Sequence, residues 1–340
     1  MLKTRKEIVR YEKPVLTSKD VPYPSSCVFN AGVVKYKGKY IMVFRNDYDY
    51  LYGPHFGGTN IGLCYSDDGI NWKVEPEPCF ALKDDEINRV YDPRLTVIDD
   101  KIYMCFAMDT KHGVRGGIAT TNDFHLNSAS SKIANASAVH HGPINFEILT
   151  LSTPDNRNMV LFPEKINNKY VRLERPFTVY SRGGKDRFDI WSSESPDLVY
   201  WGNSNLVLGV EDFYFCNNKI GPAAPPIKTE KGWLTIIHTV DLDESRGKNG
   251  WEDIWQKRYC AAIVLLDLEN PSKVIGMCKE PLMVPEVDFE IKDGFRTNVI
   301  FPTGMILEDD GEVKIYYGAA DTVIALATAN VHDLINLCLK

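Results

Sequence analysis

The chain has 340 residues, 44% of them hydrophobic, and its 39 basic and 46 acidic side chains give a net charge of −7. This is the composition of an ordinary globular protein with a large core, and the acidic balance argues against nucleic acid or an anionic membrane as the main partner. No apolar stretch is long enough to span a membrane, and segment 1–16 lacks the apolar core of a signal peptide. We therefore expect a cytoplasmic protein in which any anion-binding site is local.

The cysteines and histidines point away from disulfides and metals. The eight cysteines show no CxxC or other close pairing, and several lie in apolar, strand-like segments. This pattern is typical of small buried side chains in a reducing compartment. The seven histidines include the pair His140 and His141 but no HxxxH or HExxH spacing, so we expect no metal site and interpret this pair as exposed loop residues.

A pair of apolar strands around a polar turn recurs along the chain. After an N-terminal arm (1–28), the pattern occupies residues 31–45, 94–107, 158–175, 222–238 and 299–317. A second motif, a strand of small residues followed by a polar turn, lies between these hairpins. Five units of four strands with few helical segments are the signature of an all-β fold, a five-bladed β-propeller.

The rest of the chain fits one propeller. The segment after Asn330 predicts a short C-terminal helix, a cap over 330–340. No linker divides the chain, so we expect a single domain over 1–340. Long insertions at 46–60, 127–147, 178–188 and 241–258 are expected to form loops on the faces of the propeller.

The segment 88–96 places a carboxylate and a guanidinium two residues apart. Asp92 precedes Pro93, which favours an extended backbone, so we expect Asp92 at the start of a strand. Taken alone, the simplest interpretation is a structural pair of Asp92 and Arg94.

Equivalent positions of the repeat carry polar residues. Those before the first strand of each hairpin are Asn30, Asp92, Arg157 with Asn158, Lys219 and Asn298, and those ending the second strand are Arg45, Asp109, Arg175, His238 and Asp321. In a propeller both sets can converge at one end of the central channel as a ligand site.

The cations among these residues come from the third and fourth units. Arg157, Arg175, Lys219 and His238 form a group whose Arg forks and Lys suit phosphate. An alternative is that each cation pairs with a nearby carboxylate, such as Glu164 or Glu174. Aromatic residues are also frequent near the predicted loops, as in sites that bind sugars.

Several motifs are specific enough to indicate a family. They are YDPR around Asp92, NRN at 156–158, FPEKINNKY at 162–170, LERP at 173–176, SESPDLVYWG at 193–202, KIG at 219–221 and GWLTIIH at 232–238. With them the chain resembles the β-mannoside phosphorylases of glycoside hydrolase family 130, which are five-bladed propellers, over nearly its whole length.

The resemblance implies a role for each matching residue. Asp92 would be the general acid. The phosphate-binding set would be Arg157, Asn158, Arg175, Lys219 and His238. The sugar-binding set would be Asn30, Arg45, Asp47, Tyr91, Arg94, Asp109, Asp189 and Asp321.

The implied reaction is the reversible phosphorolysis of β-mannosides with inversion. Inorganic phosphate would be the co-substrate, without a cofactor, and the products would be α-mannose 1-phosphate and a shortened sugar. An inverting hydrolase needs a second carboxylate to activate water, whereas phosphate is already an anionic nucleophile. The partners would be a β-linked manno-oligosaccharide and phosphate, and a homo-oligomer is compatible with the sequence.

The chain departs from the mannosyl-glucose phosphorylases at Ala31, in segment 46–60 and in segment 109–117. These departures favour β-1,2-mannobiose or oligomannan over β-1,4-linked mannosyl-glucose or mannooligosaccharides. Two further alternatives are a β-mannosidase of the same fold that uses water and a non-catalytic sugar-binding propeller.

Overall fold

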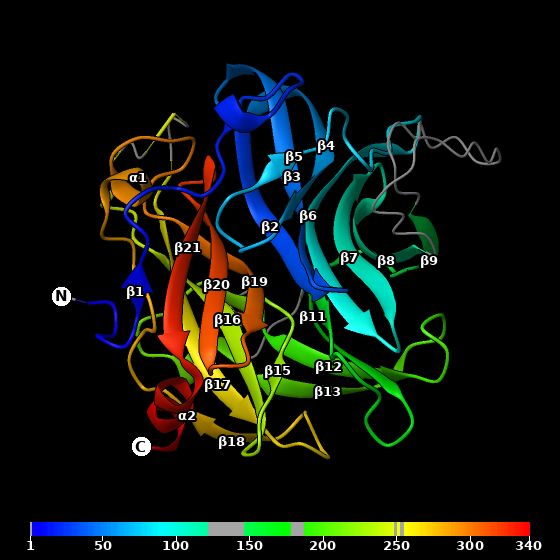
Figure 1. Cartoon of the computed structure of the whole chain (residues 1–340), viewed down its shortest axis with the longest axis vertical. Coiled ribbons are helices and arrows are strands. Elements are labelled where there is room, and N and C mark those ends of the chain that lie inside the picture. The colour runs from blue at the N-terminus through cyan, green and yellow to red at the C-terminus, as the bar shows by residue number, and fades with distance from the viewer. Residues whose placement is uncertain (1, 122–145, 178–186, 248–249, 252–254) are drawn as a thin grey trace.

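Five β-sheets surround a common centre (Figure 1). The computed structural model describes residues 2–121, 146–177, 187–247, 250–251 and 255–340. The predicted loop 127–147, apart from its last two residues, lies outside this part of the chain, as do His140 and His141. The predicted loops 178–188 and 241–258 are described only in part.

Consecutive antiparallel strands build each sheet. Blade 1 contains β2 (Cys27–Tyr36), β3 (Lys39–Tyr52), β4 (His55–Ser66) and β5 (Lys73–Val74). Blade 2 contains β6 (Ile87–Ile98), β7 (Lys101–Thr110), β8 (Gly113–Thr121) and β9 (Glu147–Leu151). Blade 3 contains β10 (Asn156–Leu161), β11 (Tyr170–Pro176), β12 (Ile190–Ser195) and β13 (Gly202–Leu208).

Blade 4 contains β14 (Lys219–Pro222), β15 (Ile227–Lys228), β16 (Trp233–Leu242), β17 (Lys257–Leu266) and β18 (Val274–Met277). Blade 5 contains β19 (Ile300–Leu307), β20 (Glu312–Ala319), β21 (Val323–Asn330) and, as its outer strand, β1 (Val9–Arg10). The predicted all-β, five-bladed propeller is therefore confirmed.

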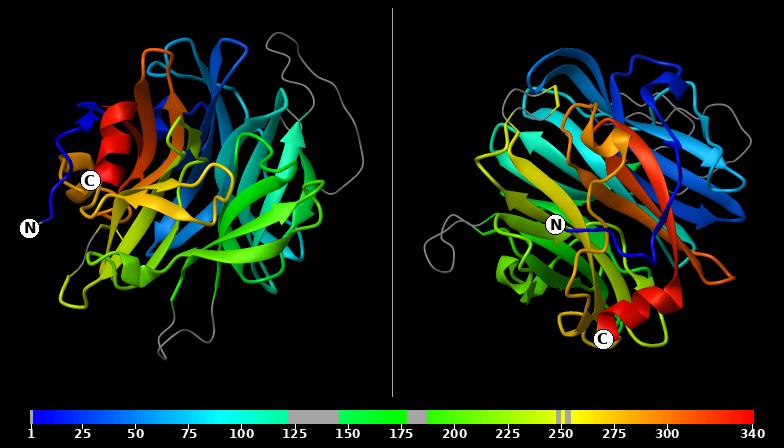
Figure 2. Two further views of the ribbon diagram at one scale, coloured as in Figure 1. Left: turned by 90° about the horizontal axis from the view of Figure 1, so that it is seen from below. Right: turned by 90° about the vertical axis from the view of Figure 1, so that its left-hand side faces the viewer.

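The N-terminal arm closes the ring of blades. Val9 and Arg10 pair with Thr328 and Ala327 of β21, so the two ends of the chain meet in one sheet. Arg10 also donates a hydrogen bond of 2.9 Å from its Nε to the buried carboxylate of Glu290. Both chain ends lie on the same side of the molecule (Figures 1 and 2).

The helices of the described residues are few and short. The predicted C-terminal helix is α2 (Val331–Leu339), whose N-cap Asn330 accepts a hydrogen bond from the backbone N–H of His332. Sequence analysis missed the single helical turn α1 (Asp288–Ile291) and the 3₁₀ turns η1 (Ser18–Asp20) and η3 (Val210–Asp212). No helix in this part of the chain is long and apolar enough to cross a membrane.

Hydrophobic clusters fill the spaces between neighbouring blades. Val43 and Leu63 of blade 1, for example, pack in one cluster with Met104 and Phe106 of blade 2, and comparable clusters join the other neighbouring pairs. All eight cysteines are buried and free, as predicted. Since apolar residues occupy the inter-blade spaces, the polar residues that face the centre stand out as a separate group.

In the first three blades the bulge of the innermost strand contains an Asn or Asp with a left-handed backbone. Asn30, Asp92 and Asn158 have positive φ angles of 52°, 54° and 59°, and each lies at a break in the register between the first and second strands. Asn and Asp tolerate this left-handed conformation better than other non-glycine residues, and a bulge redirects a side chain. The sequence-based expectation that Asp92 has an extended backbone at a strand start is wrong, because the bulge outweighs the preference set by Pro93.

Segment 46–60 is also not the loop that was expected. It continues β3 and β4 beyond the body of the sheet as a long hairpin that turns at Gly53 and Pro54. Tyr50 packs against Trp251, and Phe56 against Phe295, with ring centroids 5.2 Å and 5.0 Å apart. The hairpin thus reaches from blade 1 to the segment that precedes blade 5.

Candidate active site

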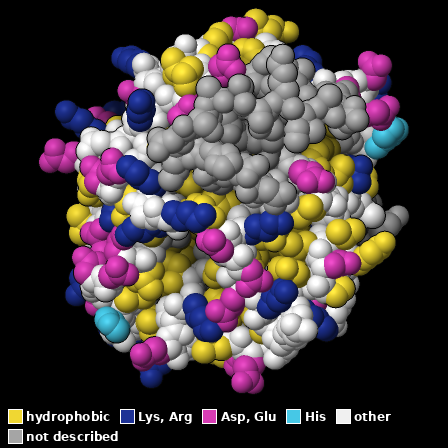
Figure 3. Space-filling model, turned by 45° about the vertical axis from the view of Figure 1, so that its right-hand side comes forward, with side chains coloured by type: hydrophobic (Ala, Val, Ile, Leu, Met, Phe, Trp, Pro, Cys, Tyr) yellow, Lys and Arg dark blue, Asp and Glu magenta, His cyan; other side chains and the backbone are white. Residues whose placement is uncertain are grey.

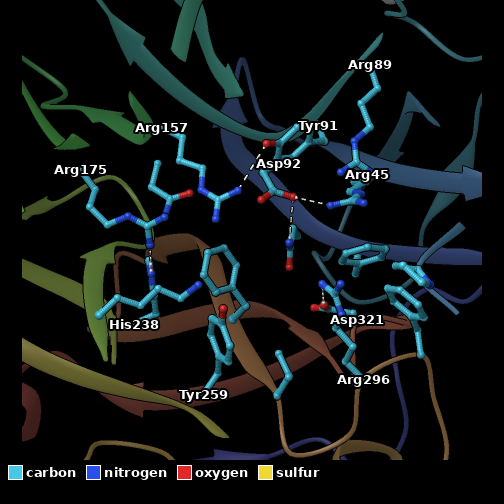
Figure 4. A pocket seen from close by; sticks show the side chains of 18 of the residues that line it. Arg45, Arg89, Tyr91, Asp92, Arg157, Arg175, His238, Tyr259, Arg296 and Asp321 are labelled. Carbon is cyan, nitrogen blue, oxygen red and sulfur yellow. Dashed lines mark hydrogen bonds and ion pairs between the residues drawn. The ribbon is translucent and has the colours of Figure 1, made fainter. Parts of the chain in front are cut away.

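A pocket at the centre of the propeller receives side chains from all five blades (Figure 4). Of the fourteen residues predicted for a site, ten line this pocket. They are Asn30, Arg45, Tyr91, Asp92, Arg157, Asn158, Arg175, Lys219, His238 and Asp321. The two sets of equivalent positions in the repeat therefore converge on this pocket, except for Asn298 and Asp109, which do not line it.

Asp92 is the carboxylate at the centre of this pocket. Its Oδ1 accepts hydrogen bonds from Nδ2 of Asn30 at 2.9 Å and from Nη1 of Arg45 at 3.4 Å. Burial alone would raise the pKa of Asp92, but Arg45, Arg94, the Asn30 hydrogen bond and Arg157 together hold it below its ordinary value. Asp92 is consequently ionised at neutral pH in the free protein.

The buried carboxylate of Asp47 holds the Arg45 side chain in place. Its Nε and Nη2 donate to the two oxygens of Asp47 over 2.9 Å and 2.6 Å, a bidentate pair in which Asp47 is fully buried. Its guanidinium also lies 4.5 Å from the ring centroid of Phe29 and 5.1 Å from that of Tyr91. These contacts orient the remaining Nη1 donor toward Asp92.

Four cationic or imidazole side chains gather beside Asp92. Nη1 of Arg175 lies 3.3 Å from Nε2 of the fully buried His238. Nε of Arg157, Nε and Nη2 of Arg175 and Nδ1 of His238 are buried and have no hydrogen-bond partner among the residues that the structure describes. Buried donors are rarely left unpaired, so this group is arranged for an acceptor that the described part of the chain does not supply.

Glu164 and Glu174, the carboxylates named as alternative partners, do not pair with these cations. Glu164 forms its ion pair with Lys228, and Glu174 forms its ion pair with Arg172. Neither carboxylate lines the pocket.

The cations depress one another's pKa. Burial, with Arg157 close by, lowers the pKa of Arg175 to about 9. Burial together with Arg175 and Arg157 lowers the pKa of Lys219 well below its ordinary value, and the pKa of His238 is lowered in the same way by burial and then by Arg175. His238 is therefore neutral at physiological pH, and an anion bound here would relieve the mutual repulsion. The surface differs from this group, since Lys and Arg are interspersed with Asp and Glu on the face in Figure 3.

Asp321 is a second carboxylate of the pocket. Nη1 of Arg296 contacts its Oδ2 at 3.5 Å. Burial raises the pKa of Asp321 to about 6, with Arg296 and Arg45 opposing the shift and Asp92 adding to it. Asp321 thus titrates close to neutral pH.

Four predicted site residues lie behind the pocket and support it. Asp47 holds Arg45, as described above. Arg94 is buried and donates to the backbone carbonyls of Asp92 and Ala223 over 2.8 Å and 2.9 Å. Asp189 is also buried and accepts the backbone N–H of Val210 at the start of η3. Asp109 contacts other side chains of blade 2 rather than the pocket itself.

Sequence analysis missed several pocket residues. These are Phe29, Pro54, Phe56, Arg89, Tyr259, Phe295, Arg296, Val299 and Phe301, of which Phe56 is one of the aromatic residues near the predicted loops. Tyr259 lies near the start of β17, the third strand along the sheet β14-β16-β17-β18, a position outside the two polar sets, so the repeat gives no signal for it. Arg296 lies two residues before Asn298 and could have been found by extending the first set.

Comparisons with known proteins find relatives along almost the whole chain. The family model of glycoside hydrolase family 130, described as β-1,4-mannooligosaccharide phosphorylase, matches residues 3–340. A 1,2-β-oligomannan phosphorylase from Thermoanaerobacter sp. is 33% identical over 331 residues, which cover 95% of this chain and 97% of that protein. A β-1,4-mannooligosaccharide phosphorylase from Ruminococcus albus is 32% identical over 343 residues, which cover 97% of this chain and 90% of that protein.

Among solved structures, the β-1,2-mannobiose phosphorylase from Listeria innocua in complex with β-1,2-mannobiose is similar to this chain. The TM-score is 0.78 at 25% sequence identity, and the match covers 97% of this chain and 99% of that one. The likeness therefore extends over the whole propeller and not over a single blade.

Proposed function

This chain belongs to glycoside hydrolase family 130, and from that premise we propose that it cleaves β-linked mannosides with inorganic phosphate. The products are α-mannose 1-phosphate and a shortened sugar. Residues 1–340 act as one catalytic domain, and the eight buried free cysteines support a location in the cytoplasm.

The observation that carries this proposal is the set of unpartnered donors beside Asp92. Arg157, Arg175 and His238 together present four buried N–H or ring nitrogen atoms without partners. Lys219 and Asn158 line the same part of the pocket. Phosphate offers several acceptor oxygens and up to two negative charges, which match this group in both geometry and charge.

The mannose unit lies on the other side of Asp92. Asn30 and Arg45 supply polar contacts there, Tyr91 contributes its ring, and Asp321 with Arg296 provides an acceptor and a donor for further hydroxyl groups. Asp47 and Arg94 act through the residues that they hold. In this proposal the anomeric carbon lies between Asp92 and the bound phosphate.

The reaction needs one proton and one nucleophile. Asp92 supplies the proton to the glycosidic oxygen, through the mannose 3-hydroxyl as the family resemblance implies. A phosphate oxygen attacks the anomeric carbon from the opposite face, the bond to the leaving sugar breaks, and the configuration is inverted. Phosphate beside Arg157 offsets the positive potential that lowers the pKa of Asp92, which favours the protonated acid once both substrates are bound.

Two alternatives fit less well. A hydrolase would need a carboxylate base for water, yet the remaining carboxylate of the described pocket, Asp321, is paired with Arg296. A non-catalytic sugar-binding protein would have no use for a buried cationic group opposite Asp92.

The linkage is proposed to be β-1,2. Support comes from segments 46–60 and 109–117 and from the similarity to a 1,2-β-oligomannan phosphorylase and a β-1,2-mannobiose phosphorylase. A β-1,4-mannooligosaccharide phosphorylase is similar to nearly the same degree, so β-1,4-mannosides form the competing substrate class.

The test is the release of mannose 1-phosphate from β-1,2-mannobiose, β-1,4-mannobiose and β-1,4-mannosyl-glucose, each with and without phosphate. We expect phosphate-dependent cleavage, fastest with the β-1,2-linked substrate. Free mannose released at the same rate without phosphate would identify a hydrolase and contradict the proposal.

A further inference from the structure

Asp109 and Arg89 are two charged residues beside the pocket that the proposed reaction has not used. Arg89 lines the pocket, whereas Asp109 does not. The sequence predicted that Asp109 contacts the sugar. Its geometry indicates a different task, because both of its carboxylate oxygens are already occupied by neighbours.

The register of blade 2 brings these neighbours together. Asp109 of β7 lies opposite Arg89 of β6, and Tyr91 lies two residues further along β6, on the same face as Arg89. Nε of Arg89 donates to Oδ2 of Asp109 over 2.7 Å, and the Tyr91 hydroxyl donates to Oδ1 over 2.6 Å. One carboxylate therefore fixes both side chains.

The Tyr91 hydroxyl connects Asp109 to Arg157, on the side of the pocket proposed for phosphate. Burial raises the pKa of Tyr91 to about 12, so the phenol keeps its proton at neutral pH. An ionised carboxylate can only accept hydrogen bonds, so the phenol proton points at Asp109. The lone pairs of the phenol oxygen are then left to accept from Nη1 of Arg157, which lies 3.4 Å away (Figure 4).

Arg89, the second side chain held by Asp109, is partly exposed to solvent at the pocket. Its side chain is 38% exposed, its guanidinium lies 5.0 Å from the ring centroid of Tyr91, and only its Nε is hydrogen-bonded to a described residue. Pro54 and Phe56 of the β3–β4 hairpin line the same pocket. The free Arg89 donors and this apolar wall together suit the hydroxyl edge and the apolar face of a sugar ring.

We propose that Asp109 is a positioning residue that orients Arg157 through Tyr91, and that Arg89, held by the same carboxylate, determines specificity by binding the leaving sugar. This inference rests on the proposed function. It assigns Asp109 to the support of two substrate sites and assigns Arg89 to the sugar that departs or, in the reverse reaction, accepts mannose.

Steady-state kinetics in both directions test the two parts separately. Asp109→Ala and Tyr91→Phe should each raise KM for phosphate about tenfold, the effect of one lost hydrogen bond to a charged group. The double variant should be no worse than the more affected single variant, because both changes break the same chain of contacts. Arg89→Ala should leave KM for phosphate within about twofold and raise KM for the acceptor sugar about tenfold.

The control is Asp100→Asn, an exposed position in the turn of the same β6–β7 hairpin, which should behave as wild type. The positioning role is wrong if the effects of Asp109→Ala and Tyr91→Phe on the phosphate KM multiply in the double variant. It is also wrong if Tyr91→Phe leaves the phosphate KM unchanged, a result that can be obtained even if Asp109→Ala fails to fold. An unchanged acceptor KM in Arg89→Ala would overturn the specificity role. A wild-type enzyme that shows no phosphate dependence would instead refute the proposed function, which distinguishes the two failures.

Discussion

Nη1 of Arg175 lies 3.3 Å from Nε2 of His238, so a cationic donor faces a neutral imidazole in a fully buried position. Nε and Nη2 of Arg175 have no hydrogen-bond partner among the described residues. The contact with His238 orients the guanidinium but provides no charge compensation. We therefore expect phosphate binding to depend on Arg175 more directly than sugar binding does.

Replacing Arg175 should affect the two substrates differently. Arg175→Ala is expected to raise KM for phosphate at least about a hundredfold, because it removes a buried, charge-assisted fork. KM for the mannoside should change by less than about threefold, and Arg175→Lys should be intermediate because lysine restores charge without the fork. The measurement is initial rates with each substrate varied in turn, with Lys101→Ala, at an exposed position, as the control. Equal changes in both KM values would contradict the phosphate role.

Phosphate binding should also be linked to proton uptake above neutral pH. The pKa of Arg175 is about 9 and that of Lys219 is well below its ordinary value, and in both cases burial is the main cause and neighbouring cations add to it. A bound phosphate dianion raises both pKa values, so the complex takes up protons at pH about 8.5. Calorimetric titration of phosphate in Tris and in Bicine should then give different enthalpies, and Lys219→Met should reduce the difference. Identical enthalpies in the two buffers would show that these side chains are already fully charged.

Asp92→Asn should abolish the cleavage of natural mannosides while the protein stays folded. An amide can still accept the hydrogen bond from Asn30, but it cannot deliver a proton to the leaving oxygen. We expect a loss of at least about a thousandfold in kcat for mannobiose, and a clearly smaller loss for p-nitrophenyl β-mannoside, whose leaving group needs little protonation. The melting temperature and the Asp100→Asn variant serve as controls. Equal losses on both substrates would indicate a binding role instead of an acid.

The sequence located the polar positions of the site better than their side-chain partners. The repeat aligned Asn30, Asp92 and Asn158, and the structure places them in three equivalent bulges. The left-handed backbone at Asp92 escaped prediction because it follows from pairing across the sheet and not from the neighbouring proline. Strand alternation and bulges decide which side chains reach the pocket, so Asp47 and Asp109, which lie one strand behind, could not be separated from pocket residues by sequence alone.

Asp321 should make the stability of the fold depend on pH in a defined direction. Its pKa rises from 3.8 to about 6 on folding, so the folded state holds the proton more tightly than the unfolded chain does. The stability that the fold gains from this tighter proton binding is fully present below pH 3.8 and is lost as the pH rises through about 6. At pH 7, Asp321→Asn should therefore stabilise the protein by about 2 to 3 kcal/mol while weakening mannoside binding.

The measurement for Asp321 is the unfolding free energy of wild type and variant at pH 4 and pH 7. The difference between them should be small at pH 4 and large at pH 7. Asp310→Asn, at an exposed position, is the matched control and should show no such change. A constant difference at both pH values would mean that Asp321 does not titrate between them.

The β3–β4 hairpin supplies the last prediction, because it brings an apolar wall to the pocket from outside the blades. Phe56 lines the pocket and packs against Tyr50 and Phe295, with ring centroids 5.2 Å and 5.0 Å apart. Phe56→Ala should raise KM for the disaccharide about five- to tenfold, the equivalent of about 1 kcal/mol of lost apolar contact, with KM for phosphate unchanged.

Tyr52→Ala is the matched control for Phe56→Ala, since Tyr52 belongs to the same hairpin but is 69% exposed and does not line the pocket. A hairpin that only stabilises the fold would lower the melting temperature in Phe56→Ala without changing either KM. A hairpin that forms the wall for the leaving sugar changes the disaccharide KM even where the protein remains fully folded. Measuring KM well below the melting temperature of each variant therefore separates the two roles.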